Sequence, residues 1–279
     1  MTEGTFDNDT GQRLFYRAWA PQAPACAIMA LVPGFNAHSG YYGWVGEQLA
    51  KNGISAYALD LRGRGLSDGE RFYVDSFDDY VSDLAGFLRL VKAREPGLPL
   101  YLLGHSAGGV VACLYASKHQ NELAGLICES FAFRVPAPDA ALAVLRGLSH
   151  LLPHAHVLKL KNSDFSRDPA AVSAMEQDQL IRGEAQPTQT IAAMVRADFE
   201  LEQRFADISL PLFIMHGTAD RATRPSGSQM FFENAGSRDK TLKLYEGAFH
   251  DPLNDIDKAV AMGDIVSWVR ARVARASAA

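Results

Sequence analysis

The segment "LPLYLLGHSAGGVVACLYAS", residues 98–117, joins two apolar runs through a serine that is flanked by glycines. The first run is typical of a strand buried on both faces, and the second has the spacing of a buried helix. Between them, Gly104-His105-Ser106-Ala107-Gly108 fits the pattern G-x-S-x-G, a sharp strand-to-helix turn that exposes the serine hydroxyl. Glycines suit the flanking positions because side chains there would collide in the strained turn. The alternative is a glycine-rich turn that only packs a strand against a helix.

A reactive serine needs a base, and the base needs an acid that orients it. His250 follows the predicted strand "KTLKLYEGAF" in a turn, and Asp220 follows "IMHGTA" in the same way. Loops at the carboxyl ends of parallel strands meet at one edge of the sheet, and the order Ser106, Asp220, His250 is the one known for this turn. Glu129, at the end of "GLICE", is the competing acid, and His105 is expected only to pack.

Acyl transfer also needs N–H donors for an oxyanion. One donor is expected from the backbone of Ala107, directly after the candidate nucleophile. The other is expected from Phe35, in the loop that follows the apolar run "ACAIMALV". Preorganised donors of this kind are each worth about 3 kcal/mol of barrier.

Composition and motif content argue against several other kinds of function. The 279 residues are 48% hydrophobic, enough for a full core, and the net charge of −5 argues against a nucleic-acid partner. Cys26, Cys113 and Cys128 all lie in apolar runs and are expected to be reduced core residues. The N-terminus has no secretory pattern and no apolar run nears the roughly 18 residues that span a bilayer, so a soluble cytoplasmic protein is expected. No dinucleotide, P-loop or H-E-x-x-H motif occurs, so we expect no cofactor and no metal.

Strand-like and helix-like stretches alternate on both sides of an interruption, which favours a mostly parallel sheet covered on both faces. The interruption runs from residue 134 to 208, is too long for a plain loop, and is expected to be a helical insertion with no clear strand. Strands are expected within residues 4–21 (a hairpin), 25–35, 54–69, 98–105, 123–133, 210–220 and 240–251. Helices are expected within residues 40–53, 77–97, 107–117, 225–236 and 259–273, and in the insertion within 142–160 and 187–205.

Five ordered motifs resemble the α/β-hydrolases of the monoacylglycerol lipase and lysophospholipase group: "LVPGFNAHSGYY", "LDLRGRGLSDGERFYVDSFDDYVSDL", "LLGHSAGG", "IMHGTAD" and "GAFHD". The likeness is weakest over residues 133–204. The resemblance implies one domain, 1–279, with an eight-stranded, mostly parallel sheet, helices on both faces, and a helical cap or lid at 134–208. It also implies roles for the matching residues: Ser106 as nucleophile, Asp220 as acid, His250 as base, and Phe35 and Ala107 as oxyanion donors.

One departure stands in the oxyanion loop. The family commonly has His-Gly before the first donor, and this chain has Pro33-Gly34. Proline has no N–H, but Phe35 keeps the donor.

The implied function is a serine esterase acting through an acyl-enzyme on a small, lipid-like ester such as a monoacylglycerol. An amidase or aminopeptidase is the first alternative, which would need an acidic group for a substrate ammonium. A non-catalytic receptor on the same fold is the second. Residues 137–158 suit an acyl-binding wall or a lid in transient contact with a membrane surface, but also plain packed core. The insertion carboxylates, which are not obviously clustered, are Asp139, Asp164, Asp168, Glu176 and Asp178.

Overall fold

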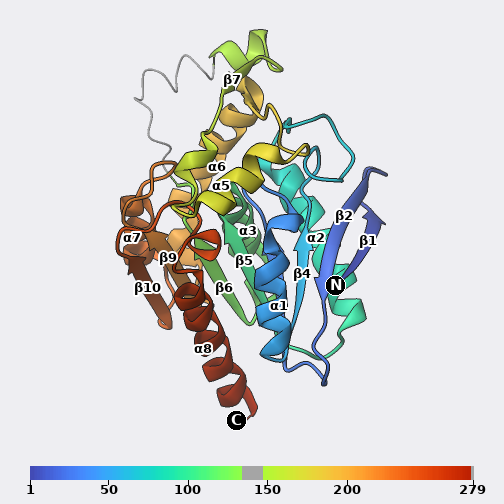
Figure 1. Ribbon diagram of the computed structural model, residues 1–279, viewed down its shortest axis with the longest axis vertical. Helices are drawn as coiled ribbons and strands as arrows, with labels where there is room; N and C mark the ends of the chain where they lie inside the picture. Colours follow the sequence, from blue (N-terminus) through green and yellow to red (C-terminus); the bar gives the residue numbers. More distant parts are fainter. Residues whose placement is uncertain (134–146, 278–279) are drawn as a thin grey trace.

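A central eight-stranded sheet organises the molecule in the computed structural model, which describes residues 1–133 and 147–277 (Figure 1). The strand order is β1-β2-β4-β3-β5-β6-β9-β10. The two pairings at the β1 end are antiparallel, and the other five are parallel. The strands are β1 (Thr2–Asp7), β2 (Arg13–Trp19), β3 (Ala27–Val32), β4 (Ile54–Leu59), β5 (Leu100–His105), β6 (Gly125–Glu129), β9 (Leu212–Gly217) and β10 (Lys240–Tyr245). The expected hairpin and mostly parallel sheet are confirmed.

Helices cover both faces of this sheet. They are α1 (Gly43–Lys51), α2 (Phe77–Arg94), α3 (Ala107–His119), α7 (Pro225–Asn234) and α8 (Lys258–Ser277). A further helix, α6 (Thr188–Arg204), packs on α3 and α2. Short 3-10 helices lie at Ser39–Tyr42, Gln120–Glu122, Asn162–Asp164, Phe205–Asp207 and Pro252–Asn254. Successive residues of β3 alternate between two cores, as the two-residue period of a strand requires. Ile28, Ala30 and Val32 pack in the core with α2 and α3, whereas Met29 and Leu31 pack in the core with α1 and α8.

The parallel strands end together at one edge, and this alignment gathers the loops of interest. Val32 pairs with Gly104, and His105 pairs with Glu129 in the next strand. Beyond β6, at the end of the sheet, Leu244 of β10 pairs with His216 of β9. The loops that begin after β3, β5, β9 and β10 therefore share one edge of the sheet.

The segment between β6 and β9 lies over that edge and departs in part from the prediction (Figure 1). Residues 147–151 are helical, and α5 (Pro169–Gln177) and α6 follow. The expectation of no clear strand is wrong, because β7 (His156–Leu158) pairs with β8 (Gln186–Pro187) in a small antiparallel sheet. Pro153 explains the error, since a proline cannot continue the helix that the apolar spacing predicts through residue 160. The expectation for residues 137–146 as an acyl-binding wall lies outside the described residues.

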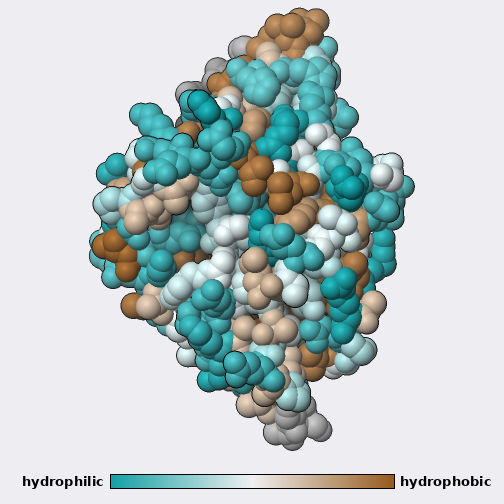
Figure 2. Space-filling model, turned by 45° about the vertical axis from the view of Figure 1, so that its right-hand side comes forward, coloured by the Kyte–Doolittle hydropathy of each residue, from teal (hydrophilic) through white to brown (hydrophobic). Residues whose placement is uncertain are grey.

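Apolar side chains gather at the top of the molecule, at the end where Figure 1 places β7 (Figure 2). In the segment that precedes β7, Leu151 is 79% exposed and Leu152 is 56% exposed. Among the described helices, none combines the length and the hydropathy that a membrane span requires. The three cysteines are free, as expected, with Cys113 and Cys128 buried in the core.

Candidate active site

Ser106 lies between β5 and α3 with a backbone conformation that few L-residues adopt. Its φ is 54° and its ψ is −122°, and it caps the N-terminus of α3 without a side-chain hydrogen bond to the helix. Such a conformation is strained, and it persists only where the surroundings hold it. The Ser106 carbonyl accepts from Gly109 N–H (2.9 Å), and its own N–H donates to the Glu129 carbonyl at 2.9 Å.

The glycines around Ser106 are required by close backbone contacts. A Cβ at Gly104 would lie 2.4 Å from the Gly108 carbonyl oxygen, and one at Gly108 would lie 2.3 Å from the Val32 carbonyl oxygen. A Cβ at Gly34 would lie 2.7 Å from the Ser106 Cβ, so the loop after β3 runs directly against the serine. These approaches explain why the turn admits no side chain at the three positions.

His250 and Asp220 are brought together from separate loops. Asp220 Oδ2 lies 2.8 Å from His250 Nδ1, and both side chains are fully buried. A carboxylate can only accept, so the proton of this hydrogen bond is on His250 Nδ1. His250 Nε2 is buried and has no hydrogen-bond partner among the described residues. The ring is therefore arranged as a base.

Asp220 is held by a second histidine that the sequence analysis left without a role. His216 Nε2 lies 2.9 Å from Asp220 Oδ2, and His216 Nδ1 lies 2.7 Å from the Ser228 hydroxyl. The Thr223 hydroxyl also donates to Asp220 Oδ2, at 2.7 Å. Burial raises the pKa of Asp220, but the nearby His250 and the hydrogen bonds from both histidines lower it by more, so it lies well below its ordinary value. The carboxylate stays ionised at neutral pH.

His105 supports the His250 loop rather than only filling space. Its Nε2 donates to the His250 carbonyl oxygen at 3.2 Å, and the two rings lie 4.8 Å apart at their centroids. Burial lowers the pKa of His105 to about 4, so this ring is neutral at pH 7. Phe165, from the segment between β7 and α5, packs edge-on against His250 at 4.9 Å. The His250 ring is thus packed against both His105 and Phe165.

Glu129, the competing acid, contacts a different part of the loop. Its Oε1 accepts from Leu253 N–H at 2.9 Å, and the side chain is fully buried. Burial and the nearby Asp251 raise the pKa of Glu129 well above its ordinary value. A neutral carboxyl cannot stabilise an imidazolium as a carboxylate does.

The two expected oxyanion donors are both free. Neither the Phe35 N–H nor the Ala107 N–H has a hydrogen-bond acceptor among residues 1–133 and 147–277. Ala107 is the first residue of α3, where orphan N–H groups and the helix dipole favour a negative charge. Within the same ranges, no group of three or more His, Cys, Asp or Glu side chains could hold a metal ion.

The chain is similar in sequence to a known family and to known proteins. Residues 23–257 match the family described as serine aminopeptidase, S33. The monoglyceride lipase of Rattus norvegicus is 31% identical over 277 residues, covering 97% of this chain and 91% of the rat protein. The monoacylglycerol lipase of Mycolicibacterium smegmatis is 29% identical over 272 residues, covering 96% of each chain.

The solved structures agree with the sequence relatives. The crystal structure of the monoacylglycerol lipase of Paleococcus ferrophilus gives a TM-score of 0.84 at 26% identity, covering 93% of this chain and 99% of that one. The expected α/β-hydrolase fold is confirmed by this likeness and by the sheet order. The family match spans most of the chain, so the protein belongs to the serine aminopeptidase S33 family of α/β-hydrolases and is a carboxylic ester hydrolase.

Proposed function

We propose that this chain hydrolyses single-chain acyl esters, with monoacylglycerols as the substrate class, through a Ser106–Asp220–His250 triad and an acyl-enzyme. The observation that carries the proposal is the buried His250 Nδ1–Asp220 Oδ2 contact of 2.8 Å, which leaves His250 Nε2 without a partner. That arrangement is the one a base needs beside a serine held in a strained turn.

In the proposed reaction, His250 Nε2 takes the Ser106 hydroxyl proton while Ser106 Oγ bonds to the ester carbonyl carbon. The Phe35 and Ala107 N–H groups donate to the oxyanion that forms. His250 then gives its proton to the leaving alkoxide, and the C–O bond to the alcohol breaks. Water repeats the sequence: its proton goes to His250 while its oxygen bonds to the acyl carbon. The bond between that carbon and Ser106 Oγ then breaks, His250 returns the proton to Ser106 Oγ, and the acid is released.

A cavity beside the oxyanion loop, lined by both polar and apolar side chains, supports an alcohol that carries free hydroxyl groups. It has a volume of about 640 Å³ and adjoins Asn36, whose side-chain oxygen is buried without a hydrogen-bond partner in the described part of the chain. Its polar lining includes Lys161, Asn162, Ser163, Glu176 and Arg182. We place the glycerol end of the substrate here, and we propose that residues 134–208 form the cap that encloses the rest.

The aminopeptidase alternative has less support, although the matching family is described as serine aminopeptidase, S33. A substrate ammonium needs an unengaged carboxylate near the serine. Asp178 already accepts from His38 (2.7 Å) and Tyr41 (2.9 Å), and Glu184 is paired with the buried Arg64. Glu176 lines the cavity and is a candidate among the described insertion carboxylates, whereas Asp139 lies outside the described residues.

The test compares wild type with Ser106→Ala on a chain-length series of p-nitrophenyl esters and monoacylglycerols, beside a panel of aminoacyl amides. We expect ester and monoacylglycerol hydrolysis that disappears in the variant, and little amide cleavage. Faster cleavage of amides than esters would replace this proposal with the aminopeptidase. If the wild type cleaves neither esters nor amides, the non-catalytic receptor would be the function that remains.

A further inference from the structure

Asn36, the residue after the proposed oxyanion donor Phe35, has a backbone conformation that needs external support. Its φ is 52°, in the left-handed region that favours glycine. Two contacts from the segment between β6 and β9 provide the support. Asn36 N–H donates to Glu184 Oε1 at 2.9 Å, and Asn36 Nδ2 donates to Asn162 Oδ1 at 3.1 Å. The shape of the oxyanion loop thus depends on residues more than a hundred positions away in the chain.

Glu184 is a buried carboxylate with several donors on one oxygen. Besides Asn36 N–H, its Oε1 accepts from the Arg64 guanidinium and from Gln186 Nε2, the latter at 2.8 Å. Glu184 is 2% exposed and Arg64 is 1% exposed. A buried charge pair of this kind does not need to stabilise the fold, because its desolvation offsets its attraction. A geometric role explains its presence better than a stabilising one.

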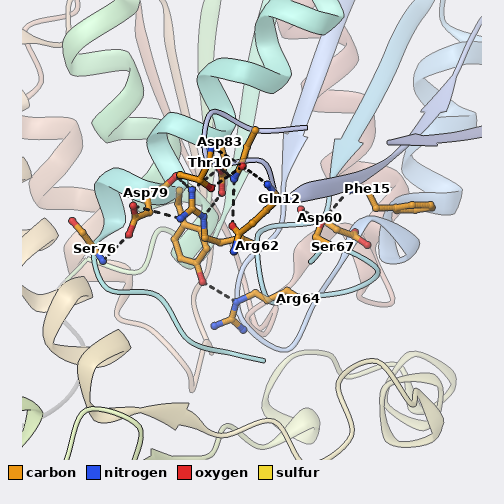
Figure 3. A network of polar contacts seen from close by, with 12 residues as sticks. Thr10, Gln12, Phe15, Asp60, Arg62, Arg64, Ser67, Ser76, Asp79 and Asp83 are labelled. Carbon is orange, nitrogen blue, oxygen red and sulfur yellow. Dashed lines mark hydrogen bonds and ion pairs between the residues drawn. The ribbon is translucent and has the colours of Figure 1, made fainter. Parts of the chain in front are cut away.

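Arg64 holds the other half of the same loop. Its guanidinium lies over the Phe35 ring, 4.0 Å from the ring centroid, in cation–π geometry. Figure 3 shows Arg64 extending away from the Arg62–Asp83 contacts, with its Nε joined to an aromatic hydroxyl, that of Tyr80 at 3.3 Å. Arg64 also donates to Gln186 Oε1 at 2.7 Å. These fixed partners leave the guanidinium little freedom to move.

We propose that Arg64 and Glu184 are positioning residues for the oxyanion hole: Arg64 holds the Phe35 ring, Glu184 holds the Asn36 N–H, and together they fix the Phe35 N–H toward the reacting carbonyl. The inference rests on the proposed function, in which Phe35 is an oxyanion donor. It assigns Glu184, in the second half of the insertion, a part in catalysis that acts through the backbone of the oxyanion loop. Because oxyanion donors act mainly in the transition state, the pair should affect kcat far more than KM.

The experiment measures kcat and KM for a short p-nitrophenyl ester with Glu184→Gln and Glu184→Ala, in folded protein as judged by circular dichroism. We expect kcat to fall about 10-fold in Glu184→Gln, which keeps an oxygen but loses its charge, and about 100-fold in Glu184→Ala, with similar KM values. Asp178→Asn is the matched control: Asp178 binds the same loop from the same insertion, but at His38 and Tyr41. Its kcat should stay at the wild-type value.

An alkyl trifluoromethyl ketone gives a readout specific to the oxyanion, since Ser106 adds to it to form a hemiketal oxyanion. Its inhibition constant should rise in step with the loss of kcat/KM, whereas the matching alcohol should bind all variants equally. If Glu184→Ala does not fold, Glu184→Gln decides: wild-type kcat and wild-type inhibition overturn the inference. Ester hydrolysis by the wild type, and its loss in Ser106→Ala, are measured first. If the wild type is inactive, the proposed function fails. If the wild type is active but the Glu184 variants match it, only the inference on Arg64 and Glu184 fails.

Discussion

Asp220 lies between two histidine rings, and the partners of those rings separate their roles. Both His216 and His250 contact Asp220 Oδ2, at 2.9 and 2.8 Å. The second nitrogen of His216 is occupied by the Ser228 hydroxyl, whereas that of His250 has no partner in the described part of the chain. His216 therefore fixes the carboxylate, and His250 is left with a nitrogen that can accept a proton.

Replacing Asp220 should disable the base without removing its ring. In Asp220→Asn the amide can donate to His250 Nδ1, which favours the wrong tautomer and removes the charge that stabilises the imidazolium. We expect kcat to fall by roughly 10⁴-fold, the scale of such a change in a serine triad. Steady-state kinetics on a short ester at pH 7.5 measures it.

Glu129→Gln is the matched control for that measurement. A glutamine oxygen can still accept from Leu253 N–H, so the loop should keep its shape and kcat should stay close to the wild-type value. The reverse pattern, with Glu129→Gln inactive and Asp220→Asn active, would assign the acid to Glu129.

Sequence reasoning placed Ser106, Asp220 and His250 at one edge because each follows a strand-like run, and parallel strands end together. It could not assign Arg64 or Glu184, which pair across 120 positions of chain. Nothing in "GRGLS" or "RGEAQ" distinguishes a buried ion pair from two surface charges, because burial depends on how the insertion packs.

At the scale of elements, the turn between β5 and α3 depends on backbone approaches that only glycine permits. A Cβ at Gly108 in α3 would lie 2.3 Å from the Val32 oxygen, whereas one at Gly263 in α8 would meet nothing within 4 Å. Glycine is therefore required at position 108, whereas position 263 has room for a side chain. Helix propensity alone would favour alanine at both positions.

Gly108→Ala should destabilise the fold by roughly 1–3 kcal/mol or more, because backbone atoms must move to admit the methyl group. Gly263→Ala should stabilise it by about 0.5–1 kcal/mol, the usual gain in an open helix interior. Urea denaturation of the two variants measures both values. Equal effects of the same sign would mean that the close approach at Gly108 is not a constraint.

The regular elements followed from periodicity, and the insertion did not. β3 is apolar throughout because alternate residues face two cores, and α2 carries its apolar residues on one stripe. The stretch 142–160 has a helical spacing, but Pro153 ends the helix and His156–Leu158 pairs with a strand about thirty residues later. Such a pairing is decided by contacts far along the chain, which a local period does not contain.

At the scale of the whole molecule, Glu129 makes stability depend on pH. Its folded-state pKa is raised by burial, so the folded chain holds this proton more tightly than the unfolded chain. The contribution to stability is present below the ordinary carboxyl pKa and is lost as the pH rises toward the folded-state value. Asp220, whose pKa is lowered, acts in the opposite sense in wild type and variant alike.

Glu129→Gln removes the titration, so its thermal stability relative to wild type should increase from pH 5 to pH 8. The difference in Tm between the two proteins, measured by differential scanning calorimetry across that range, isolates the effect of this one group. A difference that stays constant or shrinks with pH would show that Glu129 is not held protonated.

The exposed apolar end of the insertion predicts a contact with lipid aggregates. Leu151 and Leu152 are exposed apolar side chains of the insertion, and apolar side chains gather at the end of the molecule where β7 lies (Figure 2). The double variant Leu151→Ser/Leu152→Ser should hydrolyse monoacylglycerol in vesicles more slowly than wild type, with unchanged activity on a soluble short ester. Equal losses on both substrates would mean that the two leucines support the fold.

The central claim is that Ser106 is an activated nucleophile, and covalent labelling tests it most directly. An alkyl fluorophosphonate should add one phosphonyl group to wild type, with loss of fluoride, and peptide mass spectrometry should place it on Ser106. Ser106→Ala should gain no mass, and Asp220→Asn should react far more slowly. An unlabelled wild type, or an adduct on another residue, would contradict the account.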